Sequence, residues 1–271
     1  MPQSYPMTWE EAVAHVRADP SQAEFARSYF FDDPLGEACE RYRQSTEWAA
    51  VRRIIGLGAG RQSLDVGAGR GIASYALAMD GWRVSALEPD PSSLVGAEAI
   101  RAVAAEKNLP INVVQMWGEA LPFEDATFHL VFCRQALHHA RDLPSLCREI
   151  ARVLRPGGIA LAIREHVISR REDLQVFLEA HPLHRLYGGE HAYLLAEYIG
   201  ALTQAGLRLV SVLNPLSTDI NLYPLSRDEL KSRIAAKWRL PSPRLIPDWM
   251  LRLKGDAMND PGRPYSFVGI K

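Results

Sequence analysis

A glycine-rich turn between a predicted strand and a predicted helix constrains this fold more than any other segment. Residues 64–71 read LDVGAGRG, and they join a short apolar run to a helical pattern at 72–79. Glycine adopts backbone angles that other residues avoid, and it lets a ligand approach the main chain closely. Gly67, Gly69 and Gly71 therefore predict a strand–turn–helix unit with a ligand site at the carboxyl end of the strand.

Strand and helix patterns alternate along the middle of the chain. Such alternation is typical of a parallel sheet with helices on both faces. We therefore expect an α/β, Rossmann-like, mostly parallel sheet of seven strands, at residues 63–66, 83–87, 111–115, 128–133, 158–163, 207–213 and 265–270. Helices are expected at residues 72–79, 92–107, 143–154, 172–180, 194–204 and 227–238.

The chain has 271 residues, which fits one elaborated domain better than two. Residues 1–55 are predicted to form an N-terminal helical cap, and residues 56–271 the main domain. Lid-like insertions are expected at about 165–192 and 217–262, over the carboxyl edge of the sheet.

Two cap signals lie in the N-terminal segment. Thr8 and Glu11 have the spacing of a capping box. In this motif the Thr8 hydroxyl accepts a backbone N–H of the first helical turn, and the Glu11 carboxylate reaches back to the backbone N–H of Thr8. Asp33 before Pro34 predicts a helix with Asp33 as N-cap and proline at the first helical position.

Charge and cysteine content exclude several classes of function. Lys and Arg total 31 against 32 Asp and Glu, so a net charge of −1 gives no global attraction to nucleic acid or an anionic membrane. The three cysteines form no Cys-x-x-Cys pair, which excludes a zinc ribbon and a redox dithiol. No secretory signal or membrane-spanning run is recognisable, so we expect a soluble, cytoplasmic protein of unknown oligomeric state.

A carboxylate follows the second predicted strand. Glu88 stands 19 residues after Gly69, where it can accept hydrogen bonds from ribose hydroxyls. The dinucleotide fingerprint would need glycine at position 72, which is Ile72. Asp65, two residues before Gly67, would repel a pyrophosphate and attract an ammonium or sulfonium group. The pattern disfavours a nicotinamide oxidoreductase and indicates a nucleoside with a cationic amino-acid tail.

Ordered motifs occupy about residues 60–165. They are Asp65-Val-Gly-Ala-Gly-Arg-Gly71, Ala86-Leu-Glu-Pro-Asp90, Gly118-Glu-Ala-Leu-Pro-Phe123, Leu137-His-His139 and Glu149-Ile-Ala-Arg-Val-Leu-Arg-Pro-Gly-Gly158. In this order they resemble the motifs of class I S-adenosylmethionine (SAM)-dependent methyltransferases, especially the small-molecule group often labelled type 11. The resemblance implies SAM as cofactor, S-adenosylhomocysteine (SAH) as product, and a small-molecule acceptor at an oxygen, nitrogen or carbon atom.

The resemblance also implies roles for individual residues. The glycine loop would contact the methionine portion, Asp65 its amino group, and Glu88 the ribose. Members of the family usually have an acid two positions before Glu119; here Trp117 stands there and either stacks on adenine or packs in the wall. The cofactor set implied is Asp65, Gly67, Gly69, Gly71, Glu88, Trp117, Gly118, Glu119, Arg134 and Gln135.

Three histidines are candidates for catalysis. His138 and His139 follow the fourth predicted strand, and His166 follows the fifth within Arg164-Glu165-His166. His138 or His139 is expected to serve as general base toward the acceptor, and Arg164, Glu165 and His166 to contact the acceptor. The alternative for His139 is that it orders the loop by hydrogen bonding.

A second group of polar residues lies between 181 and 191. His181, His184, Glu190 and His191 offer metal ligands, but they match no known zinc spacing, and adjacent Glu190 and His191 cannot both point inward from one helical face. We expect no metal there and a substrate-facing lid with glycine hinges.

Aromatic residues outside the core are candidates for the acceptor wall, although ordinary packing explains most aromatics on helices. Two alternatives to methyl transfer stay open: a noncatalytic subunit with the same fold, and a SAM-binding enzyme with non-methyl chemistry. The aromatic candidates are Tyr5, Trp9, Tyr29, Phe30, Phe31 and Trp249, with Tyr187, Tyr193 and Tyr223 as further ones.

Overall fold

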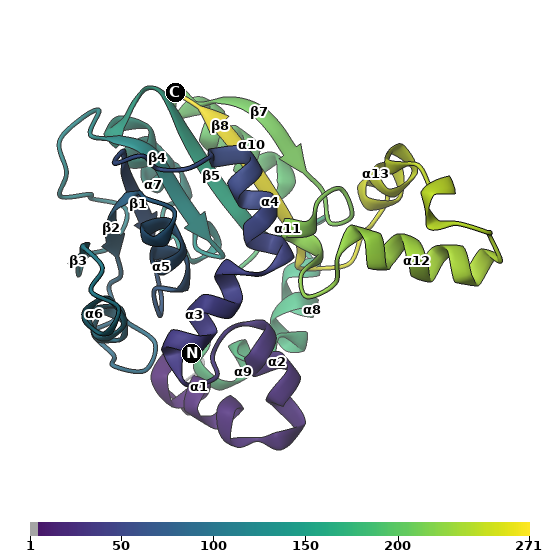
Figure 1. Ribbon diagram of the computed structural model, residues 1–271, viewed down its shortest axis with the longest axis horizontal. Helices are drawn as coiled ribbons and strands as arrows, with labels where there is room; N and C mark the ends of the chain where they lie inside the picture. The colour runs from purple at the N-terminus through teal and green to yellow at the C-terminus, as the bar shows by residue number, and fades with distance from the viewer. Residues whose placement is uncertain (1–4) are drawn as a thin grey trace.

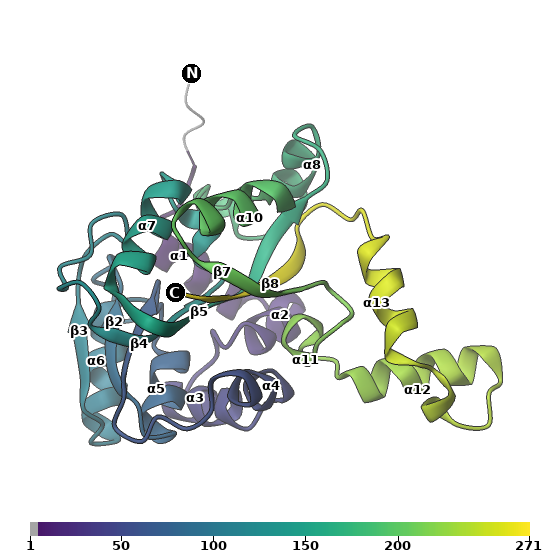
Figure 2. The same ribbon diagram turned by 90° about the horizontal axis from the view of Figure 1, so that it is seen from above.

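A twisted sheet runs through the middle of the molecule, with helices on both faces (Figures 1 and 2). The computed structural model describes residues 5–271; the part of the N-terminus at 1–4, where no signal sequence is expected, lies outside the described residues. Within them the sheet has eight strands. These are β1 Gln62–Val66, β2 Arg83–Leu87, β3 Ile111–Val114, β4 Phe128–Arg134, β5 Leu154–Ile168, β6 Tyr193–Leu194, β7 Arg208–Leu213 and β8 Arg263–Ile270.

The strand order is β3-β2-β1-β4-β5-β8-β7, with β6 paired to β5 off this path. Strands β1 to β5 are parallel, whereas β8 runs antiparallel to both β5 and β7. The expected α/β, Rossmann-like fold is confirmed. The count exceeds seven because the two-residue strand β6 adds to β5.

Alternating side chains of the central strands divide the core into two layers. Val131 and Cys133 of β4 face one cluster, while Leu130 and Phe132 face the other, as the two-residue period of a strand requires. Helices α7 (Leu143–Val153) and α10 (Leu195–Gln204) cover the first face. The second face is covered by α3 (Leu35–Arg43), α4 (Thr46–Ile55), α5 (Ile72–Met79), α6 (Ala97–Glu106) and α11 (Asp219–Leu222), as Figure 2 shows.

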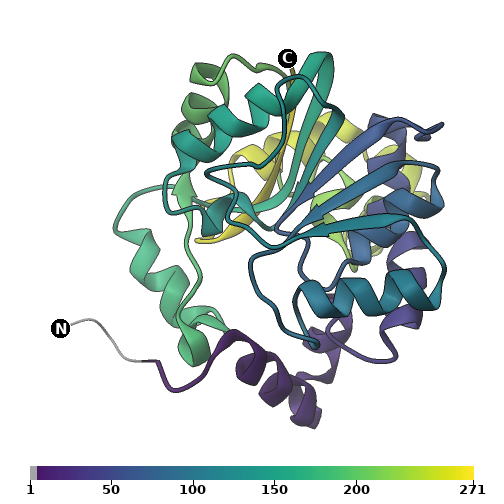
Figure 3. The ribbon, with the colours of Figure 1, turned by 90° about the vertical axis from the view of Figure 1, so that its left-hand side faces the viewer.

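Segments far apart in sequence meet beyond the carboxyl ends of β1 and β4. Figure 3 shows the purple N-terminal helices and the green α8–α9 segment together on that side. The Met7 N–H donates to the Leu186 carbonyl at 3.2 Å, and Val13 packs with Leu183 in one buried cluster. The helices are α1 (Trp9–Ala18), α2 (Ala23–Ser28), α8 (Asp173–Ala180) and α9 (His184–Tyr187).

The N-terminal cap signals are partly confirmed. The Thr8–Glu11 capping box is present. The Asp33 prediction is wrong by one residue, since Pro34 is the N-cap and α3 begins at Leu35. Further along, the side chain of Ser45 accepts the Trp48 N–H and starts α4 as a separate helix.

Strand β5 is longer than the sequence predicts. It continues past residue 163 because β8 pairs with it as far as Val167 and Arg263. Arg164, Glu165 and His166 therefore lie within the strand, and the prediction that they follow it is wrong. A register shift between Ala162 and Glu165, with Arg164 at φ +59°, sets the direction of their side chains.

Helices α12 (Arg227–Trp238) and α13 (Asp248–Asp256) project from the edge of the molecule instead of covering the carboxyl edge of the sheet (Figures 1 and 2). Trp238 and Trp249 are 55% and 64% exposed there. Among residues 5–271, no helix combines the length and apolar character needed to cross a membrane.

Substitution of Trp48 tests how α4 packs on the sheet. Its side chain is fully buried, and its indole N–H donates to the Asp80 carboxylate at 2.9 Å. Trp48→Ala should lower the free energy of unfolding by about 3–5 kcal/mol, because it leaves a large cavity and removes the indole hydrogen bond to Asp80. Trp238→Ala, at an exposed site, should change it by less than about 0.5 kcal/mol. Urea denaturation measures both; equal losses would contradict this account of the core.

Candidate functional site

A cavity of about 440 Å³ lies at the carboxyl ends of β1, β2 and β4. Its walls come from the glycine-rich turn, the ends of these strands, His166 of β5, and residues of the N-terminal segment and the α8–α9 region. Ligand sites of open α/β sheets lie in this position, outside the carboxyl ends of the strands. The size is within the range of small-ligand pockets.

The three glycines of the turn have different tasks. Gly67 has φ +67°, and a Cβ on it would come within 2.8 Å of the Ala136 Cβ, so only glycine allows this approach of β1 to β4. Gly69 has φ +55° and open space where a Cβ would stand, so its main chain borders the cavity. Gly71 caps α5 beside Ile100 and, unlike Gly67 and Gly69, is absent from the residues that line the cavity.

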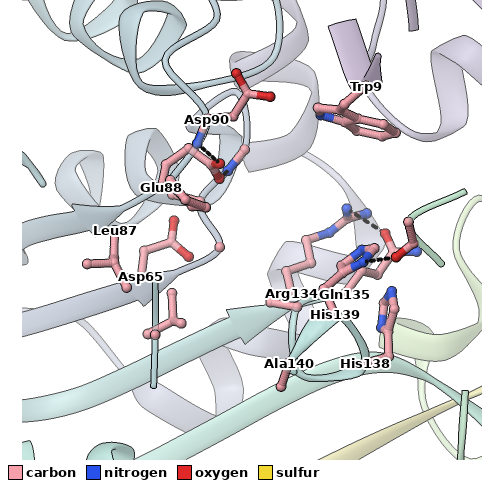
Figure 4. A pocket seen from close by; sticks show the side chains of 18 of the residues that line it. Trp9, Asp65, Leu87, Glu88, Asp90, Arg134, Gln135, His138, His139 and Ala140 are labelled. Carbon is pink, nitrogen blue, oxygen red and sulfur yellow. Dashed lines mark hydrogen bonds between the residues drawn. The ribbon is translucent and has the colours of Figure 1, made fainter. Parts of the chain in front are cut away.

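Two buried carboxylates share one wall of the cavity (Figure 4). Glu88 accepts the Gly69 N–H at 2.7 Å and the Asp90 N–H at 3.0 Å, and burial raises the pKa of its carboxyl to about 7. Asp65 accepts the Ser74 hydroxyl at 2.6 Å, and burial raises its pKa to about 6. This wall favours ligands that bring hydrogen-bond donors or positive charge.

The loop after β3 forms an adjoining wall. Trp117 is 52% exposed, and the Arg141 guanidinium lies 4.3 Å from its ring centroid. A Cβ on Gly118 would meet the Leu146 Cδ1 at 2.6 Å, so a larger residue here would have to displace the end of the leucine side chain. Glu119 accepts the Arg141 N–H at 2.8 Å, which joins this loop to the segment after β4.

Arg134, the last residue of β4, is held by an acid that the sequence analysis missed. Its guanidinium donates to both oxygens of Glu47, at 2.7 and 3.2 Å, and Glu47 is fully buried on α4. Arg134 also donates to the Gln135 side chain at 2.9 Å. A glutamate on the apolar face of a predicted helix is the signal that could have identified Glu47. Both Arg134 and Gln135 line the cavity, as expected.

Arg70 connects the glycine-rich turn to the N-terminal segment, and sequence reasoning missed it too. Its buried guanidinium donates to the Phe30 and Asp32 carbonyls at 3.0 and 2.9 Å and pairs with Asp33. These contacts fix the aromatic part of the cavity wall. Five of the predicted aromatic residues line it: Trp9, Tyr29, Phe30, Phe31 and Tyr187. The other four predicted ones do not, namely Tyr5, Tyr193, Tyr223 and Trp249.

His138 is buried between two carboxylates. Its Nδ1 lies 2.7 Å from Glu165 and its Nε2 3.5 Å from Glu190. Burial alone would lower the pKa of His138, but these two carboxylates raise it to about 9. Glu165 also accepts the backbone N–H groups of residues 136–138, so it orders the turn that carries both His138 and His139.

His139 presents the more accessible imidazole, with a side chain 39% exposed. Its Nδ1 lies 2.9 Å from the Gly189 carbonyl, a contact in which the ring nitrogen donates. Burial, together with the positive charge of His138, lowers the pKa of His139. Its Nε2 therefore carries the lone pair at neutral pH.

His166 and His181 meet His138 and Glu190 in one cluster. The His166 Nδ1 lies 3.0 Å from the Gly262 carbonyl, and its ring centroid is 4.5 Å from that of His138. Glu190 enters because residues 188–192 form a loop, which turns its side chain inward. As expected, Glu190 and the adjacent His191 do not both face the cavity. His184 and His191 lie outside the lining.

Asp65 and Glu88, with the main chain at Gly67 and Gly69, form one wall of the cavity, the glycine wall. Its two carboxylates should make the free energy of unfolding depend on pH. Each binds its proton more tightly in the folded protein, so its stabilising contribution is full below its ordinary pKa and is lost as pH rises through about 6 for Asp65 and about 7 for Glu88. From about pH 4 to 8 the ligand-free protein should lose on the order of 3 kcal/mol of stability per group. Denaturation of Asp65→Asn and Glu88→Gln should show shallower slopes; slopes equal to that of the wild type would refute the assignment.

The sequence of this chain is similar to those of known methyltransferases. Residues 64–162 match a family model described as a methyltransferase domain. The chain is 30% identical to a ubiquinone biosynthesis O-methyltransferase of Methylobacterium nodulans over 173 residues, which are 61% of this chain and 67% of that protein. A protein of the same name from Methylocella silvestris is 35% identical over 103 residues, 38% of this chain.

The match to the second relative spans only 39% of that protein's length. Among solved structures, phosphoethanolamine N-methyltransferase 2 of Haemonchus contortus has a TM-score of 0.61 at 20% identity. This comparison covers 98% of this chain and 60% of the other, and it shows a shared fold. Fold, motifs and relatives agree, and the chain belongs to the class I SAM-dependent methyltransferases.

Proposed function

We propose that this chain binds SAM in the cavity and transfers its methyl group to a small-molecule acceptor. The observation that carries the proposal is the juxtaposition of the open main chain at Gly69 with the carboxylates of Asp65 and Glu88 on one wall. When bound, SAM would supply a methyl group on a sulfonium. The acceptor lone pair would form a bond to the methyl carbon as the carbon–sulfur bond breaks, with SAH as the leaving group.

The residues of the glycine wall fit the two ends of such a ligand. Asp65 would attract the ammonium of the amino-acid tail, and Glu88 would accept hydrogen bonds from the ribose hydroxyls. Trp117 and Gly118 would border the adenine, with the indole face that Arg141 leaves open available for stacking. Arg134 and Gln135 would flank the reacting end of the ligand.

The acceptor would lie between the aromatic residues of the N-terminal segment and the histidines. We assign His139 to remove the acceptor's proton, because its Nε2 carries the lone pair and its side chain borders the cavity. His138 is held between two carboxylates, so it suits positioning and electrostatic support. A cavity of about 440 Å³ and a net charge of −1 favour a small diffusible acceptor.

The names of the relatives do not fix the acceptor atom. One relative is named for O-methylation, whereas the structural neighbour is named for N-methylation of phosphoethanolamine. A noncatalytic role is disfavoured because the glycine wall retains both carboxylates. Non-methyl chemistry is distinguished by the products, since methyl transfer adds one methyl group to the acceptor and releases one SAH.

Cofactor binding is tested by calorimetry with SAH. Glu88→Ala should weaken SAH binding by about 10- to 100-fold, because it removes charged acceptors of ribose hydrogen bonds. Glu98→Ala is the matched control, since its carboxylate is 55% exposed on α6. No binding by the wild type, or equal affinities of the two variants, would contradict the proposal.

Catalysis is tested with methyl-labelled SAM and a panel of phenols, catechols and amines. With the acceptor that takes up label, His139→Asn should lower kcat by about 10²- to 10⁴-fold while SAH affinity stays within about twofold. His191→Asn, outside the cavity lining, should keep kcat. An unchanged kcat in His139→Asn rejects this base, and a panel without label transfer counts against small-molecule methylation.

A further inference from the structure

The cavity has a second wall, the histidine wall, in which the imidazoles of His138, His139, His166 and His181 surround the carboxylate of Glu190. Figure 4 shows His138 and His139 across the cavity from Asp65 and Glu88. His166 and His181 line the same side, and Glu190 lies among the four rings. The proposed binding of the cofactor uses the glycine wall on the other side of the cavity, so the nitrogen atoms and the carboxylate of the histidine wall are available for a second ligand.

The hydrogen bonds of the rings leave lone pairs for a ligand. His166 and His139 each direct Nδ1 to a backbone carbonyl, Gly262 at 3.0 Å and Gly189 at 2.9 Å. A ring that donates from Nδ1 carries its lone pair on Nε2. Metal-binding histidines characteristically make this outer hydrogen bond, because it fixes the tautomer and the direction of the ring.

The two carboxylate oxygens of Glu190 contact different groups. Its Oε2 faces His138 Nε2 at 3.5 Å and His139 Nε2 at 4.0 Å. Its Oε1 accepts the Tyr187 hydroxyl at 2.9 Å and lies 3.9 Å from His181 Nδ1. The other contact of that nitrogen, the His184 backbone N–H at 3.4 Å, is long for a hydrogen bond.

Two sets of three ligand atoms arise from this arrangement, each with all atoms within 4.8 Å of one another. One set is His138, His139 and Glu190, in which His139 is partly exposed and His138 is already paired with Glu165. The other is His166, His181 and Glu190, in which all three residues are buried. The second set has two imidazoles and one carboxylate, with no competing acid on either imidazole among the described residues.

We propose that His166, His181 and Glu190 bind one divalent transition-metal ion in the acceptor half of the cavity. Two histidines and one carboxylate are a known ligand set for zinc and for non-haem iron(II), and both leave coordination positions open. Imidazole donors disfavour magnesium and calcium, which prefer oxygen ligands.

His166, His181 and Glu190 all line the cavity, so an oxygen of the acceptor could complete the coordination of an ion held there. An ion there would hold that oxygen and lower the pKa of a bound hydroxyl. This role in acceptor binding rests on the proposed methyl transfer, whereas binding of the ion does not.

The test is metal binding to the full-length protein after chelator dialysis. Titration with Zn²⁺, followed by calorimetry, and with Co²⁺, followed by visible absorption, should each give one equivalent per chain. His181→Ala and Glu190→Gln should each weaken Zn²⁺ binding by at least about 100-fold. His15→Ala, on the exposed surface of α1, is the matched control and should bind like the wild type. Mg²⁺ should not compete.

No binding by the wild type, or equal weakening in His15→Ala and His181→Ala, would overturn the proposal. SAH titration of the same samples separates this outcome from other failures. A variant that binds SAH but not Zn²⁺ is folded and supports the site. Wild-type protein that binds SAH but not Zn²⁺ refutes the metal site alone, and protein that binds Zn²⁺ but not SAH refutes the proposed function alone.

Discussion

The close approach of two turns at the carboxyl ends of β1 and β4 determines the rest of the site. Gly67 takes φ +67° and leaves no room for a Cβ against Ala136. The approach places the glycine turn and its carboxylates on one side of the cavity and the residues after β4 on the other. A larger residue at position 67 would separate these two turns, so the cavity depends on this contact.

A buried ion pair and other buried charged side chains then connect distant segments to this point of the sheet. Glu47 brings α4 to Arg134, and Arg70 holds the N-terminal aromatic segment against the glycine turn. Glu165 orders the turn after β4 by accepting three backbone N–H groups and the His138 ring. Removing one partner of such a pair leaves a buried charge, which is more costly than losing a surface pair. The interactions that shape the cavity therefore also stabilise the fold.

Much of this was predictable from local sequence. The alternation of strands and helices predicts the parallel sheet, and the spacing of Gly67, Gly69 and Glu88 predicts which wall borders the ligand, because both depend on neighbouring residues. The spacing could not show that Gly71 caps α5 outside the cavity lining, because the same backbone conformation serves to cap a helix as well as to border a ligand.

The histidine wall depends on tertiary contacts instead. Glu190 meets His138 and His166 only because β5 extends along β8 and residues 188–192 form a loop. Glu47 and Arg134 are 87 residues apart in sequence, and no local pattern pairs them. The projecting helix α12 shows the same limit, since the pattern of residues 227–238 predicts its secondary structure but not its direction from the sheet.

A crystal structure with SAH bound would test the central claim most directly. We predict the ribose hydroxyls at Glu88, the amino group near Asp65, and the sulfur facing the histidine wall. SAH in a different position, or with its ribose away from Glu88, would contradict the account.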